Sequence, residues 1–220
     1  MRDGFGKAIL ELGHTTPEVV VLTADLGEST RVTDFSTHYP ERFFEVGVAE
    51  QNLIGVATGL ALEGFVPYAT SYATFLPGRC LDHIRISVCY NNANVKLVAS
   101  HGGLITGPDG ATHQILEDIG LMKMLPGMTV IVPADYNQTK AATKAIANMK
   151  GPVYLRFGRP VWPIFTKEED FVIGKAQMLN DGKDISIFAC GHLVWIAVEA
   201  AKILEAKGIS VDLINLHTIK

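Results

Sequence analysis

Short apolar runs rich in Val, Ile and Leu alternate along this chain with longer segments of helical periodicity. Six of these runs are expected to form buried strands: residues 19–24, 95–100, 129–134, 153–157, 185–190 and 210–216. Five further segments are expected to form helices: residues 3–13, 49–64, 76–91, 135–149 and 192–208. This order predicts an α/β fold, in which helices cover both faces of a mainly parallel sheet.

The alternation is interrupted over residues 158–183, where prolines and a cluster of charged residues indicate a crossing between two units. We therefore expect a first domain over residues 1–170, a linker over 171–183, and the start of a second α/β domain over 184–220. One strand, one helix and one strand cannot bury both faces of a parallel sheet. The second domain is therefore expected to be cut short or completed elsewhere.

Charge and composition exclude several classes of partner. The formal net charge is −4, and Lys and Arg are scattered, so no nucleic-acid partner is expected. No apolar run approaches the roughly 18 to 20 residues that a membrane helix needs. The three cysteines lie in apolar surroundings without a CxxC pair: Cys80, Cys89 and Cys190. Reduced, structural thiols in a cytoplasmic enzyme are the expected interpretation.

One carboxylate stands at the start of an otherwise small or apolar helical segment. Glu50 follows the stretch RFFEVGVA, and the chain continues as QNLIGVATGLALEG. Such a residue either decorates or caps its helix, or is placed beside an apolar site because its chemistry needs that site.

Polar residues also follow the expected strands, where ligands gather in open α/β sheets. Asp25 and Ser29 come after the first strand, and Arg156 lies near the end of the run 153–157. A Gly-rich loop extends from His101 to His113, and such a loop is costly to order unless a ligand or partner is there.

Four motifs resemble the transketolase family: VGVAEQN, SYATF, ASHGGLITGPDGATHQ and GPVYLRFGRP. The resemblance covers residues 2–220, takes in the pyrimidine-binding domain and the beginning of the C-terminal domain, and is strongest to the C-terminal subunit of split transketolases. It implies a thiamine diphosphate enzyme that moves a two-carbon ketol unit from a ketose phosphate to an aldose phosphate.

The resemblance also implies roles for the cofactor-site residues. Glu50 matches the glutamate that hydrogen-bonds the N1′ nitrogen of the aminopyrimidine and promotes the loss of a proton from C2 of the thiazolium. Tyr72 and Phe75 match aromatic residues that enclose the pyrimidine, and we expect them to form one wall on a helical turn. Asp25 matches a carboxylate near the cofactor and the subunit contact, with a helix N-cap as its structural alternative. Gly55 and Gly59 are expected to allow close helix packing.

On the substrate side, the resemblance implies that four residues hold the sugar phosphate: Arg2, Ser29, His101 and Arg156. Asp109 matches a position that reads a substrate hydroxyl. His113 matches one that contacts the reacting end and assists proton transfer.

The chain lacks the GDG and following Asn that form the usual Mg²⁺ and diphosphate site, so no metal ligands are expected in it. A separate N-terminal subunit should supply that site, in a heterotetramer with two copies of each half. Two alternatives stay open. One is an enzyme similar to deoxyxylulose-phosphate synthase, although that family has Arg-Ala-Gly where this chain has the HGG that begins at His101. The other is a non-catalytic scaffold that binds a partner.

Overall fold

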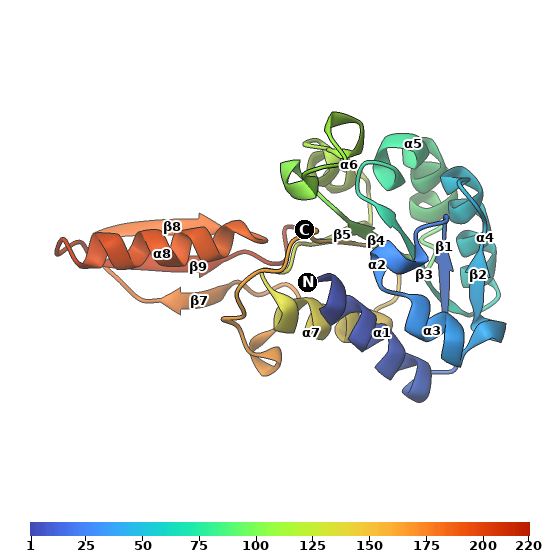
Figure 1. The fold of residues 1–220 in the computed structure, drawn as a ribbon, viewed down its shortest axis with the longest axis horizontal. Coiled ribbons are helices and arrows are strands. Elements are labelled where there is room, and N and C mark those ends of the chain that lie inside the picture. Colours follow the sequence, from blue (N-terminus) through green and yellow to red (C-terminus); the bar gives the residue numbers. More distant parts are fainter.

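A six-stranded parallel sheet forms the larger of two α/β units in the computed structural model, which describes residues 1–220 (Figure 1). The strand order is β2-β1-β3-β4-β6-β5, and every neighbouring pair is parallel. The strands are β1 (Val19–Thr23), β2 (Phe43–Glu45), β3 (Val66–Tyr72), β4 (Lys96–Ser100), β5 (Thr129–Ile131) and β6 (Val153–Arg156). The predicted fold class is confirmed.

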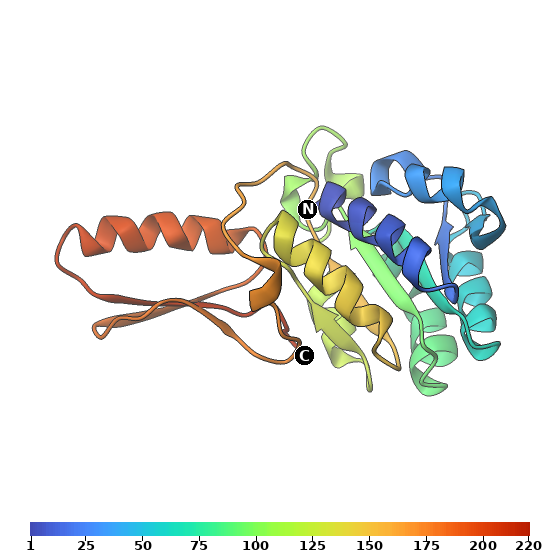
Figure 2. The same cartoon turned by 90° about the horizontal axis from the view of Figure 1, so that it is seen from below.

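Alternate residues of the strands supply two separate cores, one on each face of the sheet. Val20 and Leu22 of β1 belong to the core that packs on α4 (Glu50–Leu62), α5 (Leu76–His83) and α6 (Asp118–Met124). Val19 and Val21 belong to the core that packs on α1 (Arg2–Thr15), α3 (Thr33–His38) and α7 (Tyr136–Ala147). The two helical layers lie on opposite sides of the sheet (Figures 1 and 2).

The smaller unit projects from the edge of the first (Figure 1). It contains β7 (Gln177–Asn180), β8 (Ile185–Ala189) and β9 (Val211–Asn215), in the order β7-β9-β8, with α8 (Leu193–Glu205) against them. β8 and β9 are parallel, and β7 is antiparallel to β9. β7 therefore lies inside the stretch expected to be linker. Its sequence QMLN is only partly buried, so it carries no buried-strand pattern.

Buried hydrogen bonds join the two units. Asn215 of β9 donates to the side-chain oxygens of Gln138 in α7, at 3.1 Å, and of Gln177 in β7, at 3.3 Å. The backbone also returns to the first sheet, because the amides of Val130 and Val132 donate to carbonyls near the end of the chain, at 2.9 and 2.8 Å. These contacts extend the edge of β5 and fix the second unit there.

Several elements differ from the sequence prediction. β2 and β3 were not predicted, because β2 is short and half-exposed and β3 contains Pro67 among Ser, Thr and Tyr. The unpredicted short helices include α2 (Gly27–Thr30), α3 and α6. The expected helix over residues 76–91 forms α5 and continues as a π-helical turn, η2 (Ile84–Tyr90). No helix here combines the length and apolar character required to cross a bilayer.

The expected packing role of Gly55 and Gly59 is wrong within this chain. Both glycines are exposed on α4, and a Cβ added at either would meet no atom within 4 Å. They leave a smooth strip on the outer surface of α4 rather than a contact inside the domain.

Lys96, the first residue of β4, is a buried lysine whose hydrogen bonds stabilise the amino end of the first sheet. The side chain is fully buried, and its ammonium group donates to Asn94 Oδ1 at 2.7 Å and to the carbonyls of Met149 and Gly151 at 2.8 and 3.1 Å. Because Lys96→Met leaves three acceptors without this donor, we expect it to lower the free energy of unfolding by about 3 kcal/mol. Urea denaturation would measure this loss. Lys150→Met, at an exposed lysine in the adjoining loop, should change stability little.

Candidate functional site

Glu50 is the first residue of α4 and is buried, with 4% of its surface exposed. The residue that precedes it, Ala49, occupies the N-cap position, and no side chain caps the helix, so Glu50 does not have the capping role that was its alternative. Both carboxylate oxygens lie 2.9 Å from Nη1 of Arg79. The surroundings of Glu50 are therefore not purely apolar, because a guanidinium from α5 provides a counter-charge.

The aromatic residues at the end of β3 form a stacked group rather than one face of a helix. Tyr72 is the last residue of β3, and Phe75 immediately precedes α5, so the expected helical turn is wrong. Their rings are nevertheless nearly parallel, with centroids 5.6 Å apart. His113 meets the Phe75 ring edge-on at 5.2 Å. The expected aromatic wall is present, and a tight turn after the strand builds it.

Four residues predicted for the site line one cavity of ≈ 310 Å³. They are Asp25, Glu50, Phe75 and His113. The remaining lining is mainly small or apolar: Ala24, Leu26, Val48, Thr112 and Arg79. The cavity thus combines a buried carboxylate with an aromatic ring and an imidazole.

A backbone hydrogen bond fixes the position of Asp25, and its side chain does not cap a helix. Asp25 is exposed, adopts a left-handed conformation with φ of 59°, and donates its amide hydrogen to Glu45 Oε1 at 2.7 Å. Leu26 precedes α2, which has no side-chain cap, so the N-cap alternative for Asp25 is not observed.

The loop between β4 and α6 is ordered by its own contacts. Thr106 is fully buried, and its hydroxyl lies 2.8 Å from the carbonyl of His101 and 3.3 Å from that of His113. It thereby joins the two histidines at the ends of the loop. Gly103 and Ile115 form an additional β-bridge. Asp109 is exposed at the tip of this loop and does not line the cavity that His113 lines.

His101 is almost completely buried, with 1% of its surface exposed. Its ring stacks on Tyr72, with centroids 3.8 Å apart, and Nδ1 lies 2.9 Å from the hydroxyl of Ser100. Burial, with smaller effects from the positive charges of Arg2 and Arg159, lowers the pKa of His101 to about 3. His101 is therefore a neutral imidazole near pH 7, and its ring continues the aromatic group toward a basic cavity.

This second cavity, of ≈ 400 Å³, is lined by Arg2 and Arg159 together with Ile105–Pro108, Pro160 and Val161. Nε of Arg2 donates to the carbonyl of Arg159 at 3.1 Å, and Nη1 donates to the carbonyl of Ser29 at 3.1 Å. Arg159 donates to the carbonyl of Thr106 at 2.9 Å. Two partly exposed guanidinium groups thus face one cavity, with half-buried Ser29 beside them.

Arg156 does not line this basic cavity, and its expected place in a phosphate site stays a prediction. It is only 8% exposed, and its Nε donates to Asp118 Oδ2 at 3.0 Å, while Tyr154 donates to the same oxygen at 2.9 Å. Gly102 packs directly on the guanidinium, and a Cβ at that position would collide with it. Arg156 is therefore a buried support beneath the loop that carries His101.

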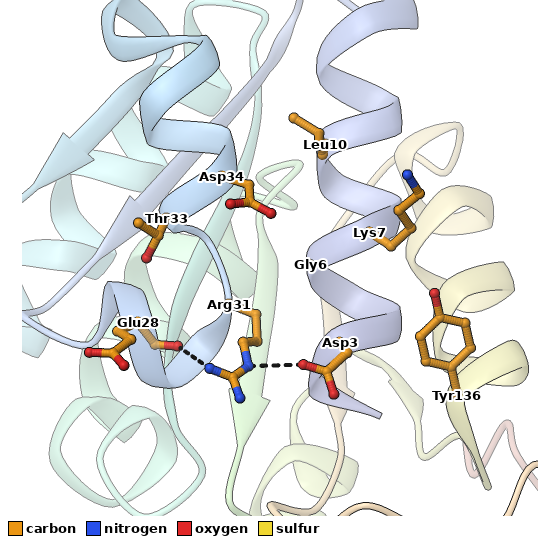
Figure 3. Close-up of a pocket in the computed structure, with 9 residues that line it drawn as sticks. All are labelled: Asp3, Gly6, Lys7, Leu10, Glu28, Arg31, Thr33, Asp34 and Tyr136. Atoms are coloured by element: carbon orange, nitrogen blue, oxygen red, sulfur yellow. Dashed lines mark hydrogen bonds and ion pairs between the residues drawn. The ribbon is translucent and has the colours of Figure 1, made fainter.

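A third cavity, of ≈ 550 Å³, lies outside the predicted site, between α1, α3 and the start of α7 (Figure 3). Its side chains carry charges of both signs, and Arg31 pairs with Asp3 at 2.9 Å. Glu28, three residues after Asp25, also lines this cavity, and its backbone carbonyl accepts a hydrogen bond from Arg31 at 3.4 Å (Figure 3).

Three residues of the site were missed from the sequence: Arg79, Arg159 and Asp118. Arg79 follows Phe75 by four positions, a helical spacing that could have placed it over the ring. Arg159 is the second arginine of RFGRP and could have been considered beside Arg156. Nothing near Asp118 in the sequence indicated its partner, which is 38 residues away.

Comparisons with known proteins agree with this arrangement. Residues 1–163 match the family model for the transketolase pyrimidine-binding domain, and residues 174–220 match that for the transketolase C-terminal domain. The structure resembles a split-gene transketolase solved as an inactive beta4 tetramer, with a TM-score of 0.91 and 46% identity, over 99% of this chain and 70% of that one.

Sequence relatives include proteins with different substrates. A putative transketolase C-terminal section from Methanocaldococcus jannaschii is 46% identical over 100% of this chain and 71% of that protein. A 6-deoxy-6-sulfo-D-fructose transketolase subunit from a Clostridium species is 40% identical over 100% of this chain and 69% of that subunit. A 1-deoxy-D-xylulose-5-phosphate synthase from Geobacter sulfurreducens is 36% identical over 98% of this chain and 34% of that enzyme.

The burial of neutral His101 makes stability depend on pH. Its folded-state pKa of about 3 lies below the ordinary value of 6.5, so the unfolded chain binds one more proton between these values. We expect the free energy of unfolding to fall as pH decreases from about 6.5 toward 3. It should fall less in His101→Asn, because Asn does not titrate in this range. Asn is chosen because it tolerates the left-handed backbone at this position.

Urea denaturation from pH 7 to pH 4 would measure the difference between the two proteins. His192 and His217, whose pKa values are also lowered by burial, remain in both proteins and cancel in the comparison. Parallel pH profiles for the wild type and the variant would contradict the assignment of a buried neutral imidazole.

Proposed function

This chain belongs to the transketolase family, and from that relationship we propose that it is the C-terminal subunit of a split transketolase. In this proposal it transfers a two-carbon ketol unit from a ketose phosphate to an aldose phosphate, using thiamine diphosphate, when an N-terminal subunit is bound. The observation that carries the proposal is the buried Glu50 carboxylate beside Phe75 in a cavity of ≈ 310 Å³.

The lining of that cavity fits an aminopyrimidine ring. Such a ring needs a carboxylate at a nitrogen on its edge and apolar or aromatic surfaces on its faces. Glu50 offers the carboxylate, while Phe75, Leu26 and Val48 offer the surfaces. When bound, thiamine diphosphate supplies the nucleophilic carbon and the electron sink for cleavage next to a carbonyl.

The residues of this chain have distinct tasks in the proposal. Glu50 holds a proton at N1′ of the pyrimidine, and the low solvent exposure of its carboxylate keeps water from competing for that bond. Phe75 orients the ring, with Tyr72 stacked beside it. His113, which is half-buried at the cavity wall, is positioned to exchange a proton with the substrate. Asp25 closes the side of the cavity formed after β1.

The basic cavity fits the phosphate end of the substrate. Arg2 and Arg159 present two guanidinium groups, which bind phosphate oxygens in a bidentate manner. His101 lies between the two cavities as a neutral ring, so it can donate one hydrogen bond without adding charge. We assign this role to Arg159 because it lines the cavity and Arg156 does not. Ser29 remains a neighbour of the site through its contact with Arg2. Asp109, at the exposed loop tip, is placed to contact a substrate hydroxyl only when the substrate or partner reaches that tip.

A partner is part of the proposal because the chain is similar to the C-terminal section of a split transketolase. No group of three or more His, Cys, Asp or Glu side chains is arranged to hold a metal ion. We assign Mg²⁺ and the diphosphate contacts to the N-terminal subunit, with two copies of each half in the assembly. The split-gene neighbour, solved as a beta4 tetramer described as inactive, supports a need for the second subunit.

Glu50→Gln tests the proton-holding role. The amide is similar in size but cannot hold the proton, so we expect kcat for ketol transfer to fall by about 100-fold or more, with folding unchanged. The assay combines this chain, an N-terminal subunit, thiamine diphosphate and Mg²⁺ with a ketose phosphate donor. Glu63→Gln, at an exposed glutamate just after the same helix, is the control. Full activity in the Glu50→Gln complex, or none in the wild-type complex, would overturn the proposal.

Arg159 and Arg156 should behave differently when each is replaced by Ala. Loss of Arg159 removes one phosphate contact, so we expect KM for a phosphorylated donor to rise by roughly tenfold, with little change for a non-phosphorylated donor. Loss of Arg156 leaves Asp118 buried without its counter-charge, so unfolding should become easier by about 3–5 kcal/mol. Steady-state kinetics and urea denaturation of both variants separate the two roles. An unchanged KM in Arg159→Ala would remove that residue from the phosphate site.

A further inference from the structure

Arg79 contacts both the Glu50 carboxylate and the Phe75 ring, which are the two groups proposed to bind the cofactor. Its Nη1 lies 2.9 Å from both oxygens of Glu50, and its guanidinium carbon lies 4.0 Å from the centroid of the Phe75 ring. Glu50, Phe75 and Arg79 all line the same cavity. A single planar group from this chain therefore binds the carboxylate and covers the aromatic ring at the same time.

Helix geometry explains this position. Phe75 is the N-cap of α5, and Arg79 follows four residues later, so both side chains lie on one face of the helix. The side chain of Gln51, in α4, donates to the carbonyl of Arg79 at 3.1 Å and holds the backbone there beside Glu50. The Arg79 side chain itself is 47% exposed, so its guanidinium is free to leave although its backbone is fixed.

The Arg79 guanidinium is more easily replaced by another donor to Glu50 than removed without a replacement. Arg79 is the only side-chain or backbone donor to the Glu50 carboxylate in this structure. A buried carboxylate left without a partner is costly, so the guanidinium can leave only when another donor takes its place. An aminopyrimidine that shares a proton with Glu50 and stacks on Phe75 would satisfy both groups that Arg79 now satisfies.

We propose that Arg79 competes with the aminopyrimidine of thiamine diphosphate for Glu50 and Phe75, so that the cofactor displaces its guanidinium from both groups as it binds. This inference rests on the proposed function. Arg79 keeps the buried carboxylate paired while the site is without cofactor, and it thereby lowers the apparent affinity for the cofactor. The opposite arrangement, in which Arg79 stays and contacts the bound cofactor, predicts the reverse effect of its removal.

Arg79→Met tests the competition, because Met keeps much of the length of the side chain without its charge or its hydrogen bonds. We measure the Kd of thiamine diphosphate by calorimetry, with Mg²⁺ present, for this chain in complex with an N-terminal subunit. Since a partly exposed ion pair and a cation–π contact are lost from the free state, we expect the Kd to fall by about tenfold. Arg85→Met, at an exposed arginine in η2, is the matched control and should leave the Kd unchanged.

A Kd that rises in Arg79→Met would show that Arg79 contacts the bound cofactor, and an unchanged Kd would show that it does not compete. Either result overturns the inference while the proposed function stands, provided that the wild-type complex binds thiamine diphosphate. Failure of a folded wild-type complex to bind it would overturn the proposed function as well.

A second measurement follows Arg79 in the wild-type complex. The side-chain Nε–H resonance of Arg79 should carry a ring-current shift from Phe75, and addition of thiamine diphosphate should remove that shift. Arg79→Lys, assigned in parallel, identifies the resonance. Persistence of the shift in the saturated complex would place Arg79 over Phe75 in the bound state and overturn the exchange.

Discussion

The parallel hydrogen bonding of the six-stranded sheet determines where every functional group of this chain can lie. Because all six strands run in the same direction, their carboxyl ends meet at one edge of the sheet. Asp25 follows β1, Tyr72 ends β3, and His101 follows β4. These residues are far apart in sequence, yet strand pairing brings them together. An antiparallel sheet with the same residues would distribute them between two edges.

Charge then divides the site into two parts. The first part contains the Glu50 carboxylate, whose buried charge is balanced by Arg79 from the neighbouring helix. The second part contains Arg2 and Arg159, whose positive charges help keep His101 neutral between the parts. An acidic group next to aromatic surfaces suits a heteroaromatic base, and a pair of guanidinium groups suits a phosphate. One substrate that extends from the cofactor to the basic cavity would use both.

Not every charged residue near the site is available to a ligand. Arg156 and Asp118 form a buried pair that supports Gly102, and through it the left-handed backbone of His101. Such a pair is costly to break, and only a small part of Arg156 reaches solvent. The junction with the second unit is similar in kind, because Gln138, Gln177 and Asn215 use their polar groups on one another. Both networks hold backbone segments in place.

The sequence by itself determined the fold class, and it named four residues that line one cavity of the candidate site. Strand and helix periodicities are local, so five helical segments and six strands were recognised, and the motif around Glu50 identified the carboxylate. Local patterns failed where a segment is short or polar, as in β2, β3 and β7. They also placed Tyr72 and Phe75 on a helical turn, whereas a strand end and a turn bring them together.

Only the tertiary structure decided that Arg159 faces a cavity while Arg156 is buried, and that Arg79 pairs with Glu50. The physical reason is that each of these outcomes depends on a partner at least 29 residues away, which no local pattern specifies.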